Sequence, residues 1–123
     1  MAIYSKKVYL EPSMLCAFID RAHPKHEQAT AFFRFFAQEE YTLFTDSINV
    51  TDAYNTIYRD ISPSLAKDFL RTVALSNINV IYPEEADMKA ALKALVNYKS
   101  TELTFQKALV AVLANKRGIS QIA

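Results

Sequence analysis

Val8-Tyr9-Leu10-Glu11-Pro12-Ser13 predicts a short apolar strand that ends in an acid and leads directly into a helix. We expect the strand over residues 6–10. Pro12 suits the first turn of the helix, because the backbone N–H that proline lacks has no intrahelical partner there. Glu11 is thereby placed at the carboxyl end of a strand. Ligands of parallel α/β sheets bind at that edge, so Glu11 is the first candidate site residue.

The rest of the chain alternates short strands with helices. Further strands are expected over residues 41–44, 79–82 and 119–123. Helices are expected over residues 12–21, from 23 or 24, from a cap at Thr45 or Ser47 to 58, from Pro63, from Pro83, and from Thr104 to Gly118. Strands separated by helices favour a parallel sheet covered on both faces. The predicted fold is one α/β domain over residues 1–123, three layers deep (α/β/α), with a mostly parallel central sheet of about four to five strands.

Apolar residues at helical spacing mark the helix faces that we expect to be buried. They are Ala29, Phe32, Phe33, Phe36 and Ala37 in the second helix, Ala66, Phe69, Leu70 and Val73 in the fourth, and Met88, Ala91, Leu92, Leu95 and Val96 in the fifth. Phe35 lies off its stripe, so we expect it at the surface or against a partner.

The composition excludes several classes of protein. The single glycine, Gly118, rules out glycine-rich phosphate loops and dinucleotide fingerprints. The single cysteine, Cys16, rules out an internal disulfide, and no signal-peptide pattern or membrane-spanning run is apparent. The formal charge of +1 offers no broad basic field for nucleic acids. We therefore expect a cytoplasmic protein with no membrane contact.

Two further segments carry candidate site residues. Asp52 lies in the third expected helix, and Lys107 lies in the first turn of the last one, behind a threonine cap. The helix dipole favours an acid at the position of Lys107, so a lysine is unexpected there. The two histidines, His23 and His26, are too few for a zinc site. Two acids and a lysine in these places suggest an oxygen-ligated metal site that has been altered.

Four stretches of the chain, taken in order, match the pattern of a known family. They are Val8-Tyr9-Leu10-Glu11-Pro12-Ser13-Met14-Leu15, His23-Pro24-Lys25-His26-Glu27-Gln28-Ala29, the segment from Phe44-Thr45-Asp46 to Asp52, and Leu103-Thr104-Phe105-Gln106-Lys107-Ala108-Leu109. They resemble the PIN domains, and in particular the VapC-like ribonucleases of bacterial toxin–antitoxin pairs. The resemblance implies a Mg²⁺- or Mn²⁺-dependent endoribonuclease that acts on RNA, pairs with an antitoxin-like protein and is often a homodimer.

The chain departs from that family at its three metal-binding positions. The family has Asp where this chain has Glu11, Glu where it has Asp52, and Asp where it has Lys107. A further acid that is common in the family would fall beyond Ala123. An ammonium a few ångströms from the ion adds repulsion of about 4 kcal/mol at an effective dielectric constant of about 20. We therefore expect Lys107 to take the metal's place and pair with both acids, leaving a pseudoenzyme that acts by binding protein or RNA.

Other interpretations stay open. In one, the chain is a working metal-dependent endoribonuclease in which Glu11 and Asp52 bind the metal and Lys107 acts as an electrophile on the phosphate. In another, all three residues are ordinary surface charges. An unrelated receiver-like domain is disfavoured, because no pair of adjacent acids follows the first strand. The polar residues that could line the same cleft, or serve only as caps, are Ser13, Thr45, Asp46, Asn49 and Thr104.

Overall fold

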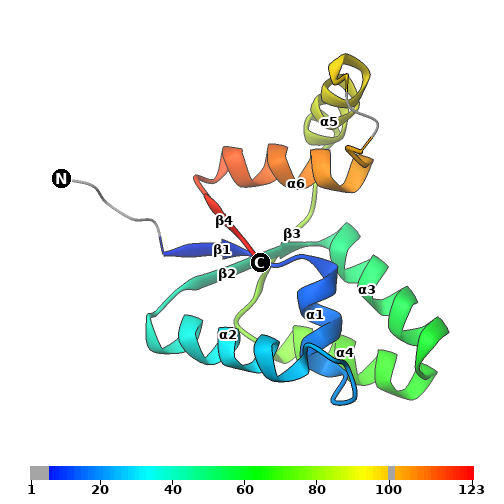
Figure 1. Ribbon diagram of the computed structural model, residues 1–123. Coiled ribbons are helices and arrows are strands. Elements are labelled where there is room, and N and C mark those ends of the chain that lie inside the picture. Colours follow the sequence, from blue (N-terminus) through cyan, green and yellow to red (C-terminus); the bar gives the residue numbers. More distant parts are fainter. Residues whose placement is uncertain (1–5, 100–101) are drawn as a thin grey trace.

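The computed structural model describes residues 6–99 and 102–123, and within them a parallel sheet of four strands (Figure 1). The strands are β1 (Lys7–Tyr9), β2 (Thr42–Asp46), β3 (Asn79–Ile81) and β4 (Gln121–Ile122). Their order is β3-β2-β1-β4, and Val8 lies opposite Leu43 on one side and Gln121 on the other. The predicted parallel sheet is confirmed. Since all four strands run the same way, their carboxyl ends meet at one edge.

Six helices within the described residues cover the two faces of this sheet (Figure 1). On one side lie α1 (Pro12–Ile19), α2 (His26–Gln38), α3 (Ser47–Asp60) and α4 (Pro63–Leu75), and on the other lie α5 (Glu85–Asn97) and α6 (Phe105–Lys116). The predicted three layers are confirmed. None of the helices in residues 6–99 and 102–123 is both long and apolar enough to cross a membrane.

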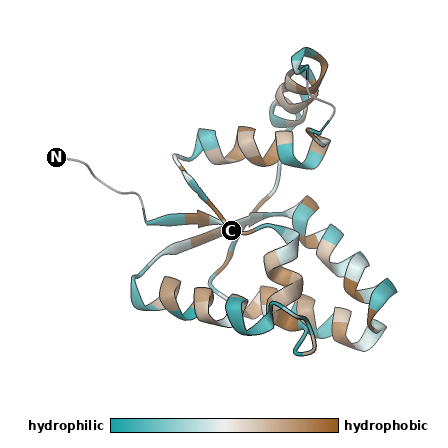
Figure 2. Cartoon of the chain, in the orientation of Figure 1, coloured by the Kyte–Doolittle hydropathy of each residue, from teal (hydrophilic) through white to brown (hydrophobic). Residues whose placement is uncertain are grey.

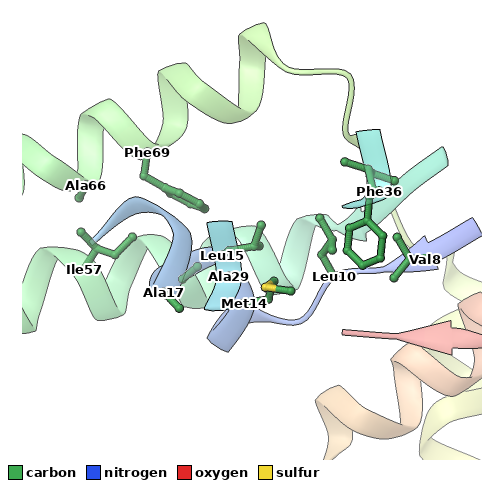
Figure 3. Packing of buried hydrophobic residues seen from close by; sticks show 12 residues of the cluster. Val8, Leu10, Met14, Leu15, Ala17, Ala29, Phe36, Ile57, Ala66 and Phe69 are labelled. Atoms are coloured by element: carbon green, nitrogen blue, oxygen red, sulfur yellow. The ribbon is translucent and has the colours of Figure 1, made fainter. Parts of the chain in front are cut away.

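Alternate residues of the segment made of β1 and Leu10, which directly follows it, enter two separate cores, as the pleat of an extended chain requires. Val8 and Leu10 pack among α1 to α4, where Phe36 lies beside both of them (Figure 3). Tyr9 points the other way and packs with Ile81 and the apolar face of α6. Helices α2 to α6 each carry both hydrophobic and hydrophilic residues, which suits helices that cover one face of a sheet, whereas α1 is mostly apolar (Figure 2).

Several helix starts differ from the sequence-based expectation because of local hydrogen bonds. The cap of α3 is Asp46, whose carboxylate accepts from the backbone N–H of Asn49 at 2.7 Å. Thr45 does not cap this helix, because it remains in β2 and donates to the carbonyl of Leu10 at 2.8 Å. Helix α2 starts at His26, since residues 23–25 form a turn, and α5 starts at Glu85 behind a capping box formed by Glu84 and Asp87. The caps at Ser62 and Thr104 are confirmed.

The buried faces of three helices are narrower than the apolar spacing predicted. Phe32 in α2 is 43% exposed and Leu70 in α4 is 41% exposed, whereas Leu92 and Val96 in α5 are 51% and 84% exposed. Ala37 is also exposed. Helix α5 packs mainly on α6, so only one line of its residues enters the core. Phe35 is 45% exposed, which confirms its predicted place off the buried stripe.

One buried hydrogen bond joins the two central strands beneath α6. The hydroxyl of Tyr9 donates to the carboxylate of Asp46, and both side chains are almost completely inaccessible to solvent. Burial raises the pKa of Tyr9 far above its usual range, and the hydrogen bond and negative charge of Asp46 raise it further. Tyr9 is therefore neutral in the folded protein at every ordinary pH. Its hydroxyl gives the buried carboxylate of Asp46 a side-chain hydrogen-bond donor.

Replacing this phenol should destabilise the fold. We expect Tyr9→Phe to lower the free energy of unfolding by about 1–3 kcal/mol in urea at pH 7, because a buried carboxylate loses a donor. Tyr41→Phe is the matched control, since the Tyr41 hydroxyl only accepts an exposed bond from Gln121. Because the pKa of Tyr9 is raised on folding, wild-type stability should fall as pH rises above about 10, more steeply than in Tyr9→Phe. Equal losses in the two variants would contradict this role.

Candidate functional site

A pocket of about 180 Å³ lies at the sheet edge where the carboxyl ends of the strands meet. The three residues singled out from the sequence, Glu11, Asp52 and Lys107, all line it. The other lining residues are Pro12, Ser13, Asn49, Thr104, Gln106 and Val110. The wall is therefore assembled from the starts of α1, α3 and α6, three segments that are far apart in the sequence.

Each charged side chain is placed by the way in which its helix begins. Glu11 is the residue before α1, half-buried, and its backbone N–H donates to the carbonyl of Ala123 at 2.7 Å. Asp52 lies in the second turn of α3 and is exposed. Lys107 is in the first turn of α6, where the hydroxyl of Thr104 accepts from its backbone N–H at 3.1 Å. Its side chain is exposed.

Two amide side chains connect the walls of the pocket. Asn49 is completely buried, and its Nδ2 donates to the carbonyl of Leu10 at 3.3 Å. Its Oδ1 accepts from Nε2 of Gln106 at 2.7 Å. Nε2 of Gln106 also donates to Oδ2 of Asp52 at 3.4 Å. The end of β1, the first turns of α3 and the first turn of α6 are thus joined through hydrogen bonds.

The predicted pairing of the lysine ammonium with both acids is not seen. Among the ion pairs of the described residues, none within 4.0 Å joins Lys107 to Glu11 or Asp52. For Asp52, Nε2 of Gln106 already contacts Oδ2, and an ion pair between an exposed ammonium and this exposed carboxylate would gain little. Lys107 shares the pocket with the acids without being bonded to them.

Sequence reasoning found most of this wall but missed Gln106. Of the polar residues that could line the cleft, Ser13, Asn49 and Thr104 do line it. The side chains of Thr45 and Asp46 are instead buried, where Thr45 donates to the carbonyl of Leu10 and Asp46 accepts from the backbone N–H of Asn49. The sequence alone does not indicate a role for Gln106, because glutamine is a common residue in the first turn of a helix. Its position next to Lys107, at a helix start that faces the strand ends, is the clue that could have found it.

The side chains of the pocket do not fit a divalent cation as they stand. In residues 6–99 and 102–123, no three His, Cys, Asp or Glu side chains form a group that could hold a metal ion. Mg²⁺ and Mn²⁺ prefer several oxygen ligands with free lone pairs. Here Oδ1 of Asn49 and one oxygen of Asp52, Oδ2, accept from Gln106, and Lys107 adds a positive charge. Of the two carboxylates in the pocket, Glu11 and the second oxygen of Asp52 are left for a metal, which is fewer ligands than either ion prefers.

The fold is PIN-like, of the VapC type. A solved structure with the same arrangement is VapC20 of Mycobacterium tuberculosis, described as a toxin that cleaves the sarcin-ricin loop. The two structures align with a TM-score of 0.82 over 94% of this chain and 86% of that one, at 15% sequence identity. No protein-family model and no curated protein matches the sequence. At this identity the likeness establishes the fold, which confirms that part of the resemblance drawn from the four sequence stretches.

Placing an acid at the position of Lys107 should make the pocket bind metal. We expect Lys107→Asp to bind Mn²⁺ with a dissociation constant of roughly 1 mM or tighter by titration calorimetry, because three acids would then line the pocket. Lys93→Asp is the control, since it makes the same charge change on the exposed side of α5. If Lys107→Asp binds no more Mn²⁺ than the control and wild type, Lys107 does not stand in a former metal site.

Proposed function

We propose that this chain is a VapC-type PIN-like domain in which metal-dependent RNA cleavage is impaired, and that it acts by binding a partner. One observation carries the proposal: an ammonium and an amide N–H group occupy the pocket beside its two acids. A nuclease of this fold would need acids there. The resemblance implies descent from such enzymes, and the chemistry of the pocket argues that their reaction has been lost.

Charge supports this interpretation. Two carboxylates and one ammonium leave the pocket with a formal charge of −1, so its attraction for a divalent cation is small. A metal in such nucleases activates water and neutralises the phosphate under attack. Without it, the hydroxyls of Ser13 and Thr104 and the ammonium of Lys107 can contact a polar ligand but cannot supply that chemistry.

A protein is favoured over RNA as the partner. The formal charge of +1 provides no broad basic field for a polyanion. Helix α2, by contrast, exposes Phe32 and Phe35, which form a shallow surface with Gln28 and Ala31. Aromatic side chains of this kind are enriched at protein interfaces. A small antitoxin-like protein that lays an apolar segment along α2 fits this surface, and a second copy of the chain is the other outcome to test.

A second candidate function is an active metal-dependent endoribonuclease. The observation that favours it is that Lys107 forms no ion pair with Glu11 or Asp52, so Glu11 and the second oxygen of Asp52 remain in the pocket as potential metal ligands. In this alternative Lys107 would contact the phosphate of the RNA. The alternative requires Asp52 to give up its bond to Gln106 when a metal binds.

The two functions are separated by a single pair of assays on the wild-type protein. We expect titration calorimetry to show no saturable binding of Mg²⁺ or Mn²⁺ in the millimolar range, because the ligand set is incomplete. We also expect single-stranded RNA to be cleaved no faster than with the control variant Glu11→Ala. Millimolar or tighter binding together with cleavage, both abolished by Glu11→Ala, would establish a working nuclease and refute the proposal.

A further inference from the structure

We propose that the side-chain amide of Gln106 takes the place of a metal ion in holding the starts of α3 and α6 together across the pocket. The inference deepens the proposed function and rests on it in one respect, the absence of a resident cation. It assigns the bridging role to Gln106 as a positioning residue, which acts through Asn49 and Asp52.

The geometry of Gln106 is that of a bridge between the two helical layers. Helices α3 and α6 lie on opposite sides of the sheet (Figure 1). Gln106 projects from α6, and its Nε2 reaches α3 twice, at 2.7 Å to Oδ1 of Asn49 and at 3.4 Å to Oδ2 of Asp52. The two N–H bonds of one amide nitrogen account for both contacts.

The acceptor that Gln106 meets is held in a fixed orientation. Asn49 is completely buried and its Nδ2 donates to the carbonyl of Leu10, so its Oδ1 must face the opposite way, toward Gln106. A buried amide oxygen needs a donor or a cation. Gln106 supplies the donor. The buried oxygen of Asn49 is therefore satisfied by a side chain of the protein and needs no metal ion.

The same hydrogen bonds compete with metal binding. A divalent cation and an amide N–H both require oxygen lone pairs, and Gln106 donates to Oδ1 of Asn49 and to one oxygen, Oδ2, of Asp52. Replacing the side-chain amide of Gln106 by a carboxylate would remove this competition and favour metal binding. In Gln106→Glu a carboxylate of the same shape would face Asp52 at about the separation that Nε2 now has, and two such carboxylates repel each other unless a cation lies between them.

The test is the effect of Mn²⁺ on the thermal unfolding of matched variants. In EDTA, we expect Gln106→Leu and Gln106→Glu to melt about 3–6 °C below wild type, because a buried acceptor is left without its donor. At a tenfold excess of Mn²⁺ over the dissociation constant, Gln106→Glu alone should recover about 3–6 °C. Gln28→Glu, the same atom change on the exposed face of α2, should show neither effect.

The results distinguish a failure of the Gln106 inference from a failure of the proposed function. Equal Mn²⁺ responses of Gln106→Glu and Gln28→Glu would overturn the inference, even if Gln106→Leu is destabilised, because a merely structural amide gives that result. A rise in the melting temperature of wild type with Mn²⁺ would instead overturn the proposed function. If Gln106→Glu is unfolded in EDTA, recovery of its helical circular dichroism on Mn²⁺ titration supports the bridge, and no recovery refutes it.

Discussion

Buried polar groups at the end of β1 must be hydrogen-bonded, and the partners come from elements that are distant in the sequence. The carbonyl of Leu10 accepts from Thr45 in β2 and from Asn49 in α3, and Asn49 in turn accepts from Gln106 in α6. These bonds fix the starts of α3 and α6 against the sheet edge. The pocket and its charged residues follow from that arrangement, since Glu11 directly follows Leu10 and Lys107 directly follows Gln106.

The fold and the chemistry of the pocket carry different information. The backbone superposes well on a toxin of known structure, yet a fold hosts many functions, and function depends on the groups at the site. Here the pocket keeps two carboxylates at the sheet edge but sets an ammonium and an amide beside them. Hydrogen bonds between side chains can hold the three helix starts together without a cation. In the proposed function, the same fold therefore persists without the set of ligands that metal catalysis needs.

Much of the architecture could be predicted from the sequence because the strands are apolar and the helix starts carry proline or a capping hydroxyl. Ser62, Pro63 and Thr104 placed two helices correctly. The extent of burial could not be predicted as well, because Leu92 and Val96 have core spacing yet face away from the sheet. Periodicity shows that a face is apolar but not whether another element covers it. The role of Gln106 depends on a contact with Asn49, 57 positions away, which no local pattern contains.

The most direct measurement of the central claim is a crystal structure of the wild-type protein soaked in Mn²⁺, with anomalous scattering used to locate the ion. The account predicts no anomalous peak between Glu11 and Asp52, and Nε2 of Gln106 within hydrogen-bonding distance of Asn49. An ordered Mn²⁺ bound by both carboxylates, with Gln106 displaced from Asp52, would contradict it.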